Sequence, residues 1–80
     1  MILQLIQGQF NTKDAIEIIT KMIEVKIKYH EDKIKLNENE EDIKFRETKI
    51  KTLQKSLQET RDFLLLKNNN IIIDGVINIS

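Results

Sequence analysis

The sequence predicts a mainly α-helical protein, in which an antiparallel two-helix hairpin with coiled-coil-like packing is flanked by short N- and C-terminal β-strands (β-α-α-β). Residues 43–64 repeat their seam positions at alternating spacings of three and four, which is typical of a heptad pattern. Residues 37–42 contain no apolar side chain and mark the turn between two helices. Both ends of the chain show the two-residue period of a strand. We expect a single domain over residues 1–80.

The first strand is expected over residues 2–10. With unbroken alternation, its side chains divide between two faces. One face then holds Ile2, Ile6 and Phe10 with Gln4 and Gly8, and the other holds Leu3 and Leu5 with Gln7 and Gln9. Both faces are therefore apolar at the start of the strand and more polar beyond it.

The first helix is expected over residues 12–36. Asn11 offers a side-chain oxygen as N-cap, and Asp14 lies near the positive end of the helix dipole. Phe10, which precedes the cap, can pack on Ala15 as a hydrophobic staple.

The apolar side chains of this helix fill an arc of roughly 200°, counting about 100° per residue. They are Ala15, Ile16, Ile18, Ile19, Met22, Ile23, Val25, Ile27, Tyr29, Ile34 and Leu36. One partner helix covers less than such an arc. The helix should therefore contact both its hairpin mate and a sheet or a second subunit.

The second helix is expected over residues 40–67, after a turn at 37–39 in which Asn39 is the N-cap. Its seam is narrow and consists of Ile43, Arg46, Ile50, Leu53, Leu57, Thr60 and Leu64. Arg46 and Thr60 are polar where apolar residues are expected. Either they fix how the hairpin pairs, or Arg46 lies near the turn and extends to water.

The last strand is expected over residues 71–79, after three asparagines that end the second helix. Asp74-Gly75 is also a strong hairpin signal. A hairpin there would scatter the isoleucines over two faces, whereas one strand, with a bulge or close approach at Gly75, keeps them together. We therefore favour a single strand.

The chain resembles small uncharacterised bacterial proteins with the same order of strand, helical hairpin and strand. The segments that carry the resemblance are Gln7-Gly8-Gln9-Phe10-Asn11, Asp14-Ala15 and Lys26-Ile27-Lys28-Tyr29-His30. It covers most of the length and implies the fold alone.

Length and composition limit how the chain can be stabilised. A chain of 80 residues buries only about 60–65% of the surface that its unfolded form exposes, so its own core is marginal. The absence of cysteine excludes disulfides and thiolate metal sites, and a single histidine cannot anchor a zinc or haem site of the usual kind. The remaining stabiliser is self-association.

Charge and hydropathy argue against several other classes of protein. Thirteen basic and thirteen acidic residues give a formal net charge of zero, so no overall charge attracts nucleic acid or an anionic membrane. The N-terminus lacks the features of a secretory signal, and the longest apolar run is four residues, from Phe63 to Leu66. We expect a cytoplasmic protein with no membrane partner.

No group of residues indicates a catalytic, cofactor-binding or metal site. His30 lies in the apolar arc with no acid or nucleophile beside it on the helix, so we interpret it as a packed or interface residue. The acidic first turn of the second helix explains Glu38, Glu40, Glu41 and Asp42, which lack the ligand pattern of a calcium loop.

The second helix is locally basic, through Lys44, Lys49, Lys51, Lys55 and Arg61. Acidic residues are interspersed among them and no aromatic ladder accompanies them. This pattern favours a solvated helix face over a phosphate-binding one.

We interpret the chain as a structural or interaction module that acts as a homo-oligomer, a dimer or larger, and that could also dock another protein. The candidate interface residues are Ile18, Met22, Val25, Tyr29, Ile71, Ile73, Ile77 and Ile79. The alternative is a nucleic-acid-associated accessory protein that uses the basic face of the second helix. An enzyme is the least favoured class, and we expect no cofactor.

Overall fold

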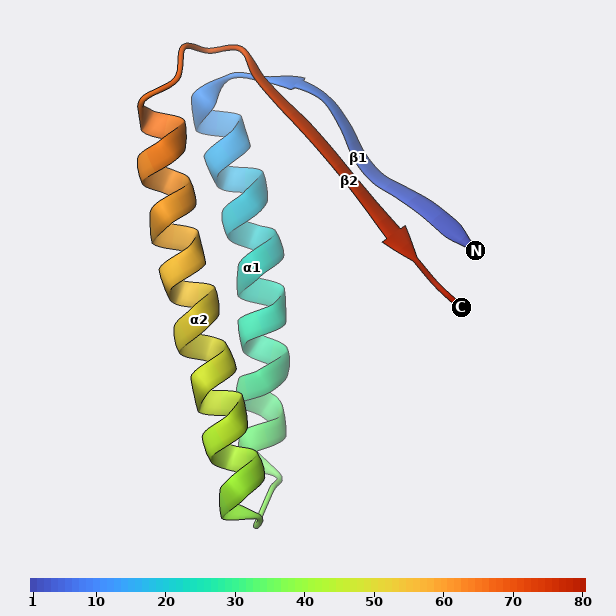
Figure 1. Ribbon diagram of the computed structural model, residues 1–80, viewed down its shortest axis with the longest axis vertical. Helices are drawn as coiled ribbons and strands as arrows, with labels where there is room; N and C mark the ends of the chain where they lie inside the picture. The colour runs from blue at the N-terminus through green and yellow to red at the C-terminus, as the bar shows by residue number, and fades with distance from the viewer.

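The computed structural model describes all 80 residues and has the predicted β-α-α-β order. β1 (Ile2–Phe10) leads into α1 (Thr12–Lys35), and α2 (Glu40–Leu65) leads into β2 (Ile71–Asn78). The two helices pack side by side and antiparallel, and the two strands form an antiparallel sheet (Figure 1). The predicted fold class is confirmed.

Three elements end slightly earlier than we expected. α1 ends at Lys35 instead of residue 36, and β2 ends at Asn78 instead of residue 79. α2 ends at Leu65 instead of residue 67. Its last turn tightens, because the N–H groups of Leu66 and Lys67 donate to carbonyls three residues earlier.

Both helices begin at the predicted asparagine caps. The Asn11 side chain accepts a hydrogen bond from the backbone N–H of Asp14 at 2.8 Å. The Asn39 side chain accepts from the backbone N–H groups of Glu41 and Asp42. These bonds satisfy N–H groups that have no partner within the helix.

One heptad seam from each helix joins the hairpin. All seven predicted seam positions of α2 are half-buried or buried. The facing positions of α1, which we call the first seam, have the same spacing and the same burial. They are Ile16, Thr20, Ile23, Ile27, His30 and Ile34.

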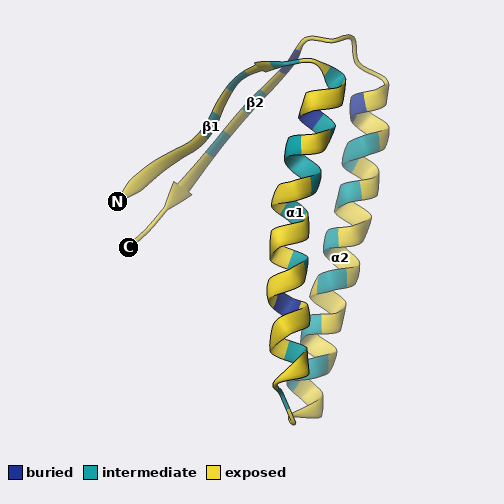
Figure 2. Ribbon diagram, turned by 180° about the vertical axis from the view of Figure 1, so that it is seen from behind, coloured by how far each residue is buried: buried dark blue, intermediate teal, exposed yellow.

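The core lies where the sheet meets the helices. Ala15, Leu64 and Ile71 are buried there, and Phe10 packs against them as the staple that the sequence predicts. The remaining buried residue is His30, farther along the hairpin (Figure 2). Two helices alone cannot enclose the side chains between them, which explains why the seams are mostly half-buried.

From this core, the β1/β2 ribbon diverges from α1 instead of lying along it (Figures 1 and 2). The molecule measures 46 × 32 × 13 Å and has a radius of gyration of 15.2 Å. A compact chain of this length has a radius of gyration of about 12 Å. The shortest dimension is close to the diameter of one helix with its side chains, about 10–12 Å. The chain by itself is thus a single layer, whereas stable domains pack at least two.

A β-bulge in β1 alters the predicted division of side chains between faces. Gln4 pairs with Val76 and Ile6 pairs with Gly75, so Leu5 is an extra residue without a partner of its own. An extra residue reverses the alternation of the residues that precede it.

The prediction that Leu3 shares a face with Gln7 and Gln9 is therefore wrong. Leu3 pairs with Ile77, and directly opposed residues of an antiparallel pair lie on the same face. Ile71, Ile73 and Ile77 of β2 lie on one face, and only the bulge allows Leu3 to lie on that face together with Ile6 and Phe10.

Asp74-Gly75 continues one strand and does not form a hairpin, as we predicted. A Cβ added at Gly75 would lie 3.1 Å from Cγ2 of Ile6, which is the predicted close approach. The bulge itself is at Leu5 on the facing strand and not at Gly75.

Candidate interaction surface

One face of the ribbon is apolar from end to end, and we call it the inner ribbon face. It begins in the core, where Ile71 is buried and Phe10 packs beside it. The strand register and the bulge extend it along both strands. Its residues are Leu3, Ile6, Phe10, Ile71, Ile73, Ile77 and Ile79.

The opposite face of the ribbon is mainly polar. Gln4 and Asp74 lie on it together, with Nε2 of Gln4 2.8 Å from Oδ1 of Asp74. Gln7, Gln9 and Asn78 also alternate onto this face. Ile2, Ile72 and Val76 lie on this face too, so it is mixed, whereas the inner ribbon face carries no polar side chain.

α1 carries a second apolar stripe with heptad spacing, which we call the second seam. It consists of Ala15, Ile18, Met22, Val25 and Tyr29, at spacings of three and four. At 100° per residue it lies about 140° around the helix from the first seam. Ala15 is in the core beside Ile71, so the second seam and the inner ribbon face begin at the same point.

On both faces, exposure is lowest in the core and higher beyond it. On the second seam it is 0% at Ala15, 38% at Met22 and 72% at Val25. On the inner ribbon face it is 7% at Ile71 and 49% at Ile79. The chain covers these faces only where they meet.

The total accessible surface is 6467 Å². A compact monomer of 9.5 kDa has about 5,050 Å² by the usual scaling with mass, so this chain exposes about 1,400 Å² more. A standard protein interface buries about 800 Å² on each partner, and obligate homodimers bury more. The excess is therefore the size of a homodimer interface.

The predicted interface residues belong to these two faces. Ile18, Met22, Val25 and Tyr29 form the second seam after Ala15. Ile73, Ile77 and Ile79 lie along the inner ribbon face, increasingly exposed. Ile71 is buried in the chain's own core, so it is not itself exposed for contact with a partner.

Other exposed apolar side chains were missed from the sequence. Phe45 and Phe63 lie on α2 outside its seam and are more than half exposed. Lys49 Nζ lies 5.2 Å from the Phe45 ring centre, and Lys67 Nζ lies 4.7 Å from that of Phe63. The sequence did contain a signal for them, because both are aromatic residues at heptad positions that are normally polar.

His30 belongs to a polar contact between the helices. Arg46 Nη1 lies 3.1 Å from His30 Nδ1, and Arg46 Nε lies 3.1 Å from Oδ2 of Asp42. Arginine can only donate, so Nδ1 is the acceptor in this contact. Arg46 therefore joins α2 to α1 instead of extending to water.

Thr60 makes no such contact across the seam. Its hydroxyl donates to the carbonyl of Ser56 in its own helix at 2.7 Å. Of the two polar seam residues, only Arg46 links the helices through a hydrogen bond.

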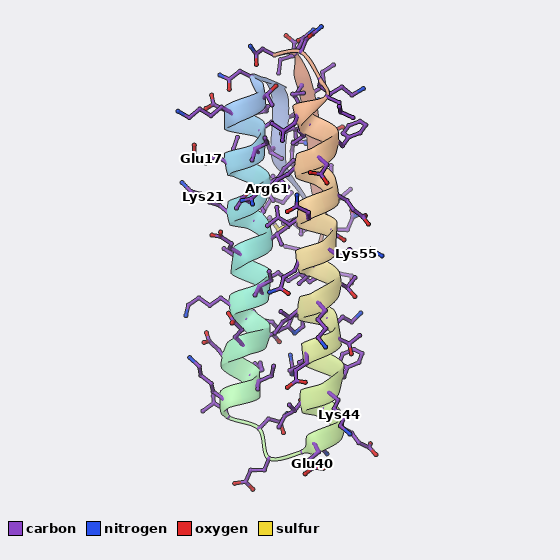
Figure 3. All side chains as sticks on the ribbon, turned by 90° about the vertical axis from the view of Figure 1, so that its left-hand side faces the viewer. Glu17, Lys21, Glu40, Lys44, Lys55 and Arg61 are labelled. Carbon is purple, nitrogen blue, oxygen red and sulfur yellow. The ribbon has the colours of Figure 1, made fainter.

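The basic residues of α2 do not form one surface. Arg61 lies between the helices, with Nη2 3.3 Å from Oγ1 of Thr20, whereas Lys44 and Lys55 point outward (Figure 3). Lys55 Nζ is 4.0 Å from a Glu59 carboxylate oxygen. The expected basic face is thus interrupted.

Beside Arg61, α1 carries an exposed ion pair of opposite charges. Lys21 Nζ lies 2.9 Å from Glu17 Oε1 (Figure 3). The hydrogen bond from Lys21, and then its charge, lower the pKa of the Glu17 carboxyl. The same contact raises the pKa of Lys21. Such mixed charge does not favour an anionic ligand.

Neither helix is both long and apolar enough to cross a membrane. In comparisons with known proteins, the chain matches no family model, no curated protein and no solved structure.

Proposed function

We propose that this chain is a structural interaction module that acts as a homo-oligomer and buries its second seam and inner ribbon face against further copies of itself. The observation that carries the proposal is the excess of about 1,400 Å² of surface over a compact chain. The excess surface lies on the second seam and the inner ribbon face, which both begin at the core.

The energies favour burial of these faces. Burying one Val, Leu, Ile or Met side chain contributes about 1.5–3 kcal/mol. Met22, Val25, Leu3 and Ile77 are all more than a third exposed. Together they represent several kcal/mol, against a typical total stability of about 5–15 kcal/mol. The isolated chain should consequently be poorly stable.

Self-association is favoured over a different protein because the second seam has heptad spacing. A heptad stripe packs best against another stripe of the same spacing, and every further copy supplies one. The nucleic-acid alternative is less favoured, because the basic residues of α2 do not form one continuous surface.

The first test is the concentration dependence of assembly and melting. Sedimentation and light scattering across micromolar concentrations should show a dimer or larger species, and the melting temperature should rise with concentration. A monomer at every concentration, with a constant melting temperature, would refute the proposal.

Val25→Lys tests the second seam directly. Val25 is 72% exposed in the single chain, so lysine there should change the stability of an isolated monomer by less than about 0.5 kcal/mol. We expect it to weaken association and lower the melting temperature. Gln54→Lys, at an exposed position of α2, is the control that adds the same charge away from the seam. Equal behaviour of the two variants would exclude the second seam from the interface.

A further inference from the structure

We infer that a second copy of this chain pairs its β2 with β2 of the first, antiparallel and with Gly75 opposite Gly75. The product is a four-stranded sheet in the order β1-β2-β2-β1. The inference rests on the proposed self-association and specifies the edge and the register through which it occurs.

The ribbon has two open edges, and β2 has the more suitable one. The bulge at Leu5 interrupts β1, and a bulge hinders the pairing of an edge strand with another chain. β2 has no bulge, proline or lysine between Ile71 and Asn78. Its one charged residue is Asp74, whose carboxylate is bound by Gln4 of its own chain.

The backbone groups at the open edge of β2 can be identified. Met1 and Ile79 exchange two hydrogen bonds, of 2.6 and 2.7 Å, so Ile79 turns its N–H and C=O toward β1. These groups alternate along a regular strand. Val76 and Asp74 therefore turn theirs to the open edge, as do Ile72 and Asn78.

The side chains select one register. The C-terminal isoleucines of the inner ribbon face are placed symmetrically about Gly75, at two and four residues on each side: Ile71, Ile73, Ile77 and Ile79. With Gly75 opposite Gly75, Ile73 lies opposite Ile77 of the second copy and Ile71 opposite its Ile79. A shift by two residues halves the number of isoleucine pairs, and in one direction it also sets Asp74 opposite Asp74.

The symmetry keeps the apolar faces together. A two-fold axis through Gly75, perpendicular to the sheet, relates two antiparallel strands and leaves both inner ribbon faces on the same side. A two-fold axis parallel to the strands would instead make the two β2 strands parallel and put the inner ribbon faces on opposite sides. Both helical hairpins then lie over one continuous apolar sheet face, which supplies the second layer that the single chain lacks.

A proline substitution tests which edge pairs. Proline is tolerated on an edge strand where its missing N–H would face solvent, so Val76→Pro should leave the single chain folded. In the paired sheet it removes two hydrogen bonds per dimer and should raise the dissociation constant roughly 30-fold or more. Gln7→Pro is the matched control, because Gln7 turns its N–H to the open edge of β1. It should dissociate like the parent.

Cysteine cross-linking tests the register, and the chain has no cysteine of its own. In the inferred register Asp74 lies opposite Val76 of the second copy, with Cα atoms about 5.5 Å apart, which suits a disulfide. Asp74→Cys and Val76→Cys chains, refolded together in a glutathione buffer, should form a disulfide-linked dimer. Neither variant should do so alone, since equivalent residues lie diagonally across the axis.

The outcomes separate this inference from the proposed function. Dissociation by Val76→Pro but not Gln7→Pro, with cross-links only in the mixture, supports the inference. A parent dimer that Val76→Pro leaves intact, or that gives no cross-link in the mixture, overturns it while self-association stands. If Val76→Pro loses the parent's helical circular dichroism, the cross-linking result decides. A parent that is monomeric throughout overturns both.

Discussion

Arg46 of α2 lies 3.1 Å from Nδ1 of His30 of α1, across the seam that joins the two helices. His30 is one of only four buried residues and the only polar one among them. This contact, continued to Asp42, places a specific polar link in a mainly aliphatic seam. Such a link fixes the register of the hairpin, because sliding either helix by one turn would leave the buried nitrogen without a donor.

Arg46→Ala should lower the free energy of unfolding by about 1–3 kcal/mol, because it leaves the buried Nδ1 of His30 unsatisfied. Urea denaturation at a fixed protein concentration measures the change. Lys49→Ala, at an exposed position of the same helix, is the control and should stay within about 0.5 kcal/mol. His30→Ala should have a modest effect, and the double variant should lose less than the sum of the two. Strict additivity would mean that the contact contributes nothing.

Thr60→Val should raise the free energy of unfolding by about 0.5 kcal/mol. The hydroxyl donates only to a carbonyl of its own helix, and such a bond slightly destabilises the helix. A methyl group in its place adds apolar contact in the seam. Thermal and urea melts of parent and variant provide the comparison. A loss above 1 kcal/mol would show that Thr60 forms a polar contact with α1 after all.

Gln4→Ala should loosen the ribbon at its bulge. The Gln4 side-chain amide lies within 3.1 Å of the carbonyls of Ile6 and Gly75 and of the Asp74 carboxylate. Backbone amides of β1 and β2 should then exchange with deuterium roughly 5- to 30-fold faster, as expected for a loss of about 1–2 kcal/mol. Gln9→Ala, on the same polar face, should leave exchange unchanged. Similar exchange rates in the two variants would mean that the hydrogen bonds of the Gln4 amide do not stabilise the ribbon.

The Glu17 carboxyl should titrate below the ordinary range for glutamate, because Lys21 donates to its charged form. A lowered pKa in the folded state means that the pair stabilises the chain above pH 4.5, and that this contribution is lost as the pH falls through the folded pKa. Both side chains are mostly exposed to solvent, so the effect on stability should be small and should vanish in high salt. NMR titration of Glu17 in the parent and in Lys21→Gln provides the measurement. An unchanged pKa in the variant would contradict the assignment.

Local pattern was sufficient for the elements and for where they start. Asn11 and Asn39 cap the helices because a side-chain oxygen at that position satisfies nearby N–H groups whatever lies elsewhere in the fold. The heptad of α2 and the width of the apolar arc on α1 likewise follow from spacing alone. The predicted interface residues on α1 came from that arc.

The bulge could not be read from β1 by itself. The apolar residues of β1 change phase between Leu5 and Ile6, but only the pairing with β2 shows that an extra residue at Leu5 sets Leu3 opposite Ile77. Arg61 was assigned to a basic face because its partner, Thr20, lies 41 residues away in sequence. Both relationships depend on residues that are far apart in the sequence.

The sequence by itself determined two helices, two strands, their caps and the surplus of apolar side chains, because each depends on neighbours along the chain or on composition. Only the tertiary structure decided that the ribbon diverges from α1, so that the second seam and the inner ribbon face open from a shared core. That choice depends on how Ala15, Leu64 and Ile71 pack together at one end of the molecule, and packing among distant residues has no period in the sequence.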